Sequence, residues 1–341
     1  MKVLHIHFGK DGGAERFFVS LAQALGERNV EQRFVIRPHR KWRDEIEDLG
    51  EIIENHYRRL SLYSLMLDWK LYRLVREWHP DAIMAWMPRA ARAIPNWSDA
   101  VKLTRLGDFP ANLKHFSLCD VLVGNLPGIS SHCKSLGWDK SVQTITNFPP
   151  DILPHPVKRS ELDTPDNVFL ISGAGRFVPR KGFDLLVRTV ANIPDAWLWL
   201  IGDGNERKAL EHLAEDLGIT DRVRFTGWVR QPIHYIAATD VFAMPSRHEP
   251  LGNVVLEAWR ANVPVVATRS EGPSWYMTNE SNGLLVDIDD LDGFINAINL
   301  LKHTPLSHKV VDGGHRDLKD RFSKERIVNQ YLELFSGNLG S

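Results

Sequence analysis

Short apolar runs alternate with amphipathic segments along most of the chain. Runs that are typical of buried strands occupy residues 2–8, 33–36, 81–86, 101–106 and 120–123, and in the second half 168–172, 197–201, 223–225, 241–244 and 263–267. Segments with helical spacing of apolar residues, such as 14–25 and 206–217, lie between them. Strands that alternate with helices form parallel sheets covered on both faces. The pattern therefore predicts an α/β protein with two doubly wound sheets.

A proline-rich and charged segment, residues 146–167, lies between the two halves and is typical of a linker. The length of 341 residues is sufficient for two domains with separate cores. We expect an N-terminal domain at 1–152 and a C-terminal domain at 166–321. In such proteins a ligand binds beyond the carboxyl ends of the strands, so we expect it in a cleft between the domains.

Charge and cysteine content narrow the class of protein. The chain has 42 Lys and Arg against 43 Asp and Glu, which argues against nucleic acid as the main partner. Up to Pro150 there are 21 basic and 17 acidic residues, so the first half is the better candidate to face an anionic surface. Cys119 and Cys133 are the only cysteines, no signal-peptide pattern is visible, and no apolar stretch reaches the length of a membrane span. We expect a cytoplasmic protein.

The first candidate site is the stretch SGAGRFVPRKG, residues 172–182, which follows a predicted strand. Gly175 lets the backbone approach a ligand closely, and Arg176 and Lys181 add positive charge before the next helix. This arrangement suits a diphosphate, although a solvated basic turn would have the same composition. The third glycine of a dinucleotide-binding fingerprint is absent.

The second candidate site is the stretch SRHEPLGNVVLEA, which places Glu249 and Glu257 eight positions apart. A helix that begins at residues 250–252 would present amides with partial positive charge to an anionic ligand. Eight residues are a little over two helical turns, so both acids can point to one side. Glu257 could equally be a helix acid paired with an arginine. A tight Gly-Asp-Gly turn at 202–204 is weaker evidence.

These segments cover most of residues 170–287. Together, and in the same order, they resemble the C-terminal domain of the family-4 retaining glycosyltransferases. The two acids match the Glu-x7-Glu motif of that family. Residues 9–25 are similar to the family's glycine-rich first loop and helix. The resemblance implies the GT-B fold, which consists of two doubly wound Rossmann-like domains facing a central cleft. It also implies that a C-terminal helix at 322–341 packs back on the first domain.

The resemblance further implies transfer of a sugar from a nucleoside-diphosphate sugar to a hydroxyl of a glycan or lipid-linked acceptor, with retention of configuration. Arg176 and Lys181 would stabilise the departing diphosphate, Glu249 would lie beside the donor sugar, and Glu257 would bind the ribose. The family needs no bound metal, and no cofactor is implied. The implied donor-binding residues are Gly12, Gly13, Gly175, Arg176, Lys181, Gly204, Glu249, Leu251, Gly252, Asn253, Val254 and Glu257.

Two positions leave alternatives open. Asp108 occupies the place of an acceptor-side His-Asp pair in many relatives, but Gly107 replaces the histidine. Asp108 therefore either positions the acceptor hydroxyl, which would make it catalytic with Arg176, Lys181 and Glu249, or caps the turn before Pro110. The triplet Asp287-Ile288-Asp289 resembles a metal-binding pattern, but a polar loop is the expected reading at a strand end.

Residues 58–79 form an amphipathic segment. One helical face carries Leu67, Leu71, Leu74, Val75 and Trp78, and further apolar positions widen it. The segment either docks the enzyme peripherally on anionic lipid near a lipid-linked acceptor or forms a core helix with a basic rim, and the second reading is favoured.

The sequence predicts a glycosyltransferase of lipopolysaccharide or surface-glycan synthesis, acting in the cytoplasm or on the inner face of its membrane. A sugar-nucleotide epimerase of similar fold and a catalytically silent nucleotide-sugar-binding module are the alternatives. The Glu-x7-Glu element disfavours the epimerase, and a transfer assay separates an enzyme from a silent module.

Overall fold

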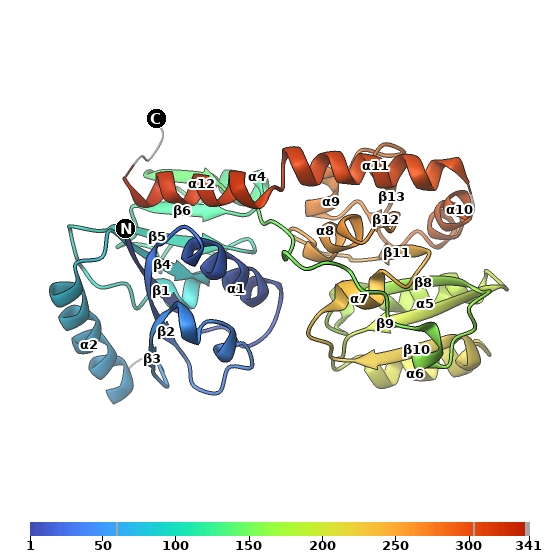
Figure 1. Cartoon of the computed structure of the whole chain (residues 1–341), viewed down its shortest axis with the longest axis horizontal. Coiled ribbons are helices and arrows are strands. Elements are labelled where there is room, and N and C mark those ends of the chain that lie inside the picture. Colours follow the sequence, from blue (N-terminus) through green and yellow to red (C-terminus); the bar gives the residue numbers. More distant parts are fainter. Residues whose placement is uncertain (59–60, 303, 338–341) are drawn as a thin grey trace. The chain divides into compact units, whose positions relative to one another are not determined.

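The computed structural model describes residues 1–58, 61–302 and 304–337. The chain divides into two compact units (Figure 1). The N-terminal unit consists of Met1–Phe148 together with Ser323–Ser341, and the C-terminal unit of Pro149–Phe322. The end of the chain therefore returns to the unit in which it began. In the part of the chain that the structure describes, every helix is too short or too polar to cross a membrane.

The N-terminal unit contains a seven-stranded parallel sheet with strand order β3-β2-β1-β4-β5-β6-β7. Its strands are β1 (Lys2–His7), β2 (Glu31–Ile36), β3 (Gly50–Glu54), β4 (Ala82–Trp86), β5 (Val101–Leu106), β6 (Val121–Gly124) and β7 (Ser141–Thr144). Its helices are α1 (Gly13–Gly26), α2 (Leu62–Trp78), α3 (Met87–Ala91), α4 (Pro127–Ser135) and α12 (Lys324–Phe335). The pattern of apolar runs missed β3 and β7. Both are edge strands and are only partly buried, so neither carries a continuous apolar run.

Helix α12 is part of the core of the N-terminal unit. Ile327 and Tyr331 are fully buried in the same apolar cluster as Phe18 of α1 and Met84 of β4. Lys324 at the start of α12 also forms an ion pair with Glu27 at 2.6 Å. The last helix is therefore held to this unit mainly by burial of its apolar face, because exposed ion pairs add little.

The C-terminal unit contains a six-stranded parallel sheet with strand order β10-β9-β8-β11-β12-β13. Its strands are β8 (Phe169–Ala174), β9 (Ala196–Ile201), β10 (Val223–Gly227), β11 (Val241–Met244), β12 (Val265–Thr268) and β13 (Leu284–Val286). Its helices are α5 (Phe183–Ala191), α6 (Arg207–Asp216), α7 (Pro232–Ile236), α8 (Asn253–Arg260), α9 (Glu271–Tyr276), α10 (Leu291–Leu301) and α11 (Pro305–Asp320).

Both faces of this second sheet are covered, which explains why its central strands are mostly apolar. Along β8, Ile171 belongs to one apolar cluster and its neighbour Leu170 to the other. Successive side chains of a strand point to opposite faces, so a central strand between two layers of helices has no polar face. The predicted pair of doubly wound parallel sheets is confirmed.

The proline-rich segment packs on the C-terminal unit. Arg159 donates hydrogen bonds to the carbonyl oxygens of Ala238 and Val168 and forms an ion pair with Asp240 at 3.1 Å. The amide of Val157 donates to the carbonyl oxygen of His234. These bonds fix the backbone of the segment, so residues after Phe148 belong to the second unit.

Candidate functional site

The strand order of the C-terminal unit indicates that the candidate site lies beyond the carboxyl ends of β8 and β11. The sheet grows from β8 in two directions, toward β9 on one side and toward β11 on the other. Ligands of open parallel sheets bind beyond the carboxyl ends of the strands where the order reverses in this way. The loops at this point are residues 175–182 after β8 and 245–252 after β11. They are the two segments that the sequence singled out for charge and glycine content.

Glycines let the loops after β8 and β9 pack backbone against backbone. The amide of Gly175 donates to the carbonyl oxygen of Ile201, and the amide of Phe177 donates to that of Asp203. A Cβ at Gly202 would lie 2.0 Å from the carbonyl oxygen of Gly175, and a Cβ at Gly204 would lie 2.3 Å from that of Phe177. Gly204 is thus required for close approach of the two loops.

Lys181 and Glu249 form an ion pair that joins the loop after β8 to the loop after β11. The exposed fractions of their side chains are only 14% and 11%. The Ser246 hydroxyl also lies 3.3 Å from the same oxygen of Glu249. A nearly buried pair of this kind makes each partner costly to remove alone, because the other charge then stays desolvated.

Two residues to which the sequence analysis assigned no role, Glu271 and His248, hold the backbone at Glu249. The Glu249 amide donates to Glu271 at 3.0 Å, and His248 Nδ1 lies 2.7 Å from the other Glu271 oxygen. Burial alone would raise the pKa of Glu271, but hydrogen bonds from its own amide and that of Glu249, and from His248, lower it overall. Glu271 is therefore held as a carboxylate. Its position directly after β12 was the signal available in the sequence.

Helix α8 begins later than the sequence analysis expected. Its first residue is Asn253, and Gly252 precedes it with a left-handed backbone (φ 82°). Glu249 therefore lies in the loop and not on the helix, so the two-turn argument for placing both acids on one side is wrong. A glycine is required at 252, because other residues strain at this φ and a Cβ would also lie 3.1 Å from the Met244 sulfur.

Tyr276 anchors the segment before α8. Its hydroxyl donates to the carbonyl oxygen of Leu251 at 2.9 Å. Burial, followed by the nearby charge of Glu249, raises the pKa of Tyr276 well above its usual value, so the phenol stays a donor. The Leu251 side chain is buried in the core. A ligand therefore has access to this segment only through backbone groups.

Four predicted donor residues lie on α8 and in the loop after β8. Arg176 is exposed, whereas Glu257 is half-buried on α8 with one carboxylate oxygen shielded from water. Asn253 and Val254 form the first turn of α8, whose amides carry partial positive charge. Helix α8 thus carries its acid in the middle and its positive end at the loop.

The Asp287-Ile288-Asp289 triplet is engaged with arginines. Asp289 lies 2.7 Å from Arg247, and Asp287 lies 3.1 Å from Arg269. Arg247 also binds both oxygens of Asp184 at 2.8 and 2.9 Å. No group of three or more metal-binding side chains occurs among the residues that the structure describes. These carboxylates have arginine partners, so the triplet is part of an ion-pair network between loops.

The N-terminal unit places its predicted residues at the carboxyl edge of its own sheet. Gly12 and Gly13 open α1 directly after β1, and Asp108 follows β5. Asp108 Oδ1 accepts a hydrogen bond from the amide of Phe109 at 2.8 Å. This bond agrees with the turn-capping interpretation, and it does not decide against a role of Asp108 at the acceptor.

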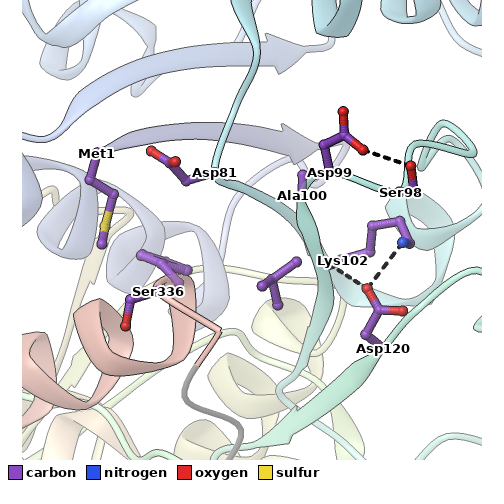
Figure 2. Close-up of a pocket in the computed structure, with 10 residues that line it drawn as sticks. Met1, Asp81, Ser98, Asp99, Ala100, Lys102, Asp120 and Ser336 are labelled. Atoms are coloured by element: carbon purple, nitrogen blue, oxygen red, sulfur yellow. Dashed lines mark hydrogen bonds and ion pairs between the residues drawn. The ribbon is translucent and has the colours of Figure 1, made fainter.

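A surface pocket of the N-terminal unit lies at the opposite edge (Figure 2). Its lining comes from the amino ends of β1, β4, β5 and β6, and includes Asp81, Lys102 and Asp120. Lys102 is paired with Asp120 at 3.1 Å, and Asp81 accepts a hydrogen bond from the Lys2 amide. Parallel sheets of this type bind substrates at carboxyl ends, so this pocket is separate from the predicted site.

Comparison with known proteins identifies this chain as similar to glycosyltransferases. A sequence model described as "Glycosyl transferases group 1" matches residues 156–316. The chain is 48% identical to the lipopolysaccharide core biosynthesis glycosyltransferase LpsE of Rhizobium meliloti (strain 1021), over 98% of this chain and 99% of LpsE. It is 46% identical to LpsD of the same strain, over 98% of both chains. The structure of Anabaena HepE in complex with UDP-glucose matches with a TM-score of 0.83 at 22% identity, over 99% of this chain and 100% of that chain. This likeness confirms the predicted fold.

Proposed function

The chain belongs to the group 1 glycosyl transferases, and from this membership we propose that it is a retaining, metal-independent glycosyltransferase of lipopolysaccharide core biosynthesis. A nucleoside-diphosphate sugar is the donor, and a saccharide hydroxyl of the growing core is the acceptor. The observation that carries the proposal is the ion pair between Lys181 and Glu249. It joins the loop after β8 to the loop after β11, at the point where the strand order of the sheet reverses. The proposal is supported by similarity to LpsE and LpsD over 98% of this chain and by likeness to the structure of HepE in complex with UDP-glucose.

The proposed chemistry uses fixed positive charge at the leaving group. The bond between the anomeric carbon and the diphosphate oxygen breaks, and a bond from the acceptor oxygen to the same carbon forms on the same face. The acceptor proton passes to the departing phosphate, so no nucleophilic side chain is assigned. Negative charge grows on the diphosphate, and Arg176, Lys181 and the first amides of α8 stabilise it where it develops. No metal ion or cofactor is needed for this step.

The remaining donor contacts follow from the same proposal. Glu257 accepts hydrogen bonds from the ribose hydroxyls, and Glu249 orients Lys181 and lies beside the donor sugar. The ammonium of Lys181 has three donors, so its bond to Glu249 leaves two for phosphate oxygens. Gly12, Gly13 and Asp108 stay predictions for the contacts that the N-terminal unit supplies.

A transfer assay tests this function. We expect sugar transfer from one of the UDP-, GDP- or ADP-sugars to lipopolysaccharide from Rhizobium meliloti cells that lack LpsE, in the presence of EDTA. NMR of the product should show the anomeric configuration of the donor. Transfer that requires added Mg²⁺ or Mn²⁺ would contradict metal independence, and an inverted product would contradict retention. Nucleoside diphosphate binding without transfer would contradict the enzymatic assignment altogether.

We also propose that α2 docks the enzyme on anionic membrane lipid. The predicted core face is confirmed, because Leu67, Leu71, Leu74, Val75 and Trp78 are buried. The opposite face is apolar as well: Leu62, Leu65 and Trp69 are 77%, 67% and 63% exposed. So large an exposed apolar surface on one helix is typical of an interaction site. The helix also has three basic residues, Lys70, Arg73 and Arg76, against two acidic ones, Asp68 and Glu77, of which Glu77 is paired with Arg73. This small excess of positive charge favours an anionic lipid surface over a protein partner.

Liposome sedimentation tests the docking of α2. We expect the protein to pellet with anionic vesicles, and the double variant Leu65→Ser/Trp69→Ser to partition at least about tenfold less, because it removes apolar area that the lipid would bury. Leu153→Ser is the matched control, since Leu153 is 72% exposed but lies in the other unit. Equal pelleting with neutral vesicles, or equal loss in the control, would disprove the proposal.

A further inference from the structure

Four arginines gather at the carboxyl edge of the N-terminal sheet. We call them the arginine cluster: Arg37, Arg40, Arg58 and Arg89. Arg37 follows β2, Arg58 follows β3 by a few residues, and Arg89 lies in α3 directly after β4. Because the strand order is β3-β2-β1-β4, these strands are close neighbours and end at the same edge. Topology therefore brings together residues that are 52 positions apart in the sequence.

The guanidinium groups of the arginine cluster act on one another. Burial lowers the pKa of Arg37, and the charges of Arg89, Arg40 and Arg58 lower it further. Burial also lowers the pKa of Arg40, while Asp11 and Glu15 partly offset this and Arg89 adds to it. Asp11 and Glu15 thus oppose the positive charge of the four arginines only in part. Like charges held close together destabilise a fold unless opposite charges compensate them.

The structure holds part of the arginine cluster in place and leaves some of its donors unused. Arg37 donates from Nη2 to the carbonyl oxygen of Tyr57, whose ring stacks on Phe8 with centroids 4.7 Å apart. The Nε atoms of Arg37 and Arg40 are shielded from solvent and have no hydrogen-bond partner among the described residues. Bulk water does not compensate a shielded N–H, so these atoms differ from those of an ordinary solvated basic rim.

Guanidinium groups gathered at one edge suit a phosphate or carboxylate, whose negative charge offsets their repulsion and which accepts paired hydrogen bonds from arginine. Arg58 and Arg89 are exposed, so such a group can reach them. The two basic residues predicted to stabilise the diphosphate, Arg176 and Lys181, lie in the C-terminal unit, so that prediction does not account for the arginine cluster. We propose that the arginine cluster binds a phosphate or carboxylate group on the acceptor saccharide. This inference rests on the proposed function and adds to it that the acceptor carries an anionic group.

Binding of the acceptor without donor tests the inference. The probe is core oligosaccharide released from the lipopolysaccharide of Rhizobium meliloti cells lacking LpsE, titrated by calorimetry into the full-length protein. We expect Arg89→Gln to raise the Kd about tenfold, the loss typical of one charge-assisted hydrogen bond, and Arg89→Lys to retain most of the affinity. Arg92→Gln is the matched control, because Arg92 is an exposed arginine three residues away that contacts His115.

Two chemically altered probes distinguish the sources of the charge. If phosphate is recognised, hydrofluoric acid treatment of the oligosaccharide should weaken wild-type binding and abolish the difference between wild type and Arg89→Gln. If a carboxylate is recognised, reduction of the carboxyl groups should do so instead. An Arg89→Gln variant that binds the intact probe as tightly as wild type overturns the inference. So does an equal loss in Arg92→Gln, or a loss that persists on both neutralised probes.

Sugar transfer by the wild-type protein tests the proposed function independently of the arginine cluster. Wild-type transfer to the same oligosaccharide shows the enzymatic activity whether or not Arg89 contributes. If wild type transfers sugar and Arg89→Gln has unchanged acceptor KM, the further inference fails and the proposed function stands. If wild type neither binds nor transfers to the oligosaccharide, both fail.

Discussion

Replacing Lys181 by methionine is expected to lower kcat about 100- to 1,000-fold, the range measured when one group that stabilises transition-state charge is removed. Methionine keeps most of the apolar stem of lysine and removes the ammonium. Donor affinity should fall much less, because the diphosphate gains negative charge only as its bond to the sugar breaks. Steady-state kinetics at saturating acceptor and calorimetric titration of the nucleotide sugar measure the two quantities.

Lys181→Met also breaks the ion pair with Glu249, so loss of stability must be separated from loss of catalysis. A double variant at both positions serves as the control. Lys181→Met leaves the Glu249 carboxylate nearly buried without its cation, so we expect thermal stability to fall as well. The double variant Lys181→Met/Glu249→Gln removes both charges and should recover stability but not turnover. Lys208→Met, at an exposed position of α6, should change neither. A kcat unchanged in Lys181→Met, or recovered together with stability in the double variant, would refute the charge argument.

The second large effect is expected at Arg105, which is buried near the carboxyl end of β5. Its guanidinium lies over the rings of Phe17 and Trp86, at 4.7 and 5.4 Å from their centroids, and donates to Asn147. Burial lowers its pKa, and the neighbouring Tyr331 of α12 partly offsets this. Arg105 thus connects β5, α1 and the returning helix, although its charge is costly to bury.

Arg105→Ala should destabilise the N-terminal unit by about 3–5 kcal/mol, as truncation of other large core side chains does. Arg105→Met should cost far less, because it fills most of the volume and removes a buried charge. Guanidinium chloride unfolding measures both, and Arg92→Ala, at an exposed position, should stay within about 0.5 kcal/mol of wild type. If Arg105→Met is as damaging as Arg105→Ala, the charge and not the packing holds α12.

The loops that form the candidate site of the C-terminal unit were predictable from local sequence. Gly175, Lys181, Glu249 and Gly252 lie in short loops directly after strands, where glycine and charge at a strand end indicate ligand contact. Local pattern was misleading at the start of α8. Pro250 is typical of a first helical turn, but the left-handed backbone at Gly252 delays the helix to Asn253. This conformation depends on Tyr276, which is 24 residues away and holds the carbonyl group of Leu251.

Other features were not readable because their determinants are far apart in the sequence. Glu271 fixes the Glu249 amide across 22 residues. The arginine cluster depends on the order in which β3, β2, β1 and β4 align. The second apolar face of α2 has the composition of a core helix, and only its place at the surface shows that Leu62, Leu65 and Trp69 are exposed.

The sequence by itself determined the two parallel sheets, the loops that carry charge and glycine, and the resemblance to a glycosyltransferase family. These follow from hydrophobic periodicity and residue type, which act over a few residues. Tertiary structure decided which loops meet, which carboxylate binds Lys181, and which arginines share one edge of a sheet. Electrostatic contacts depend on distance in space, and the alignment of strands far apart in the chain sets those distances.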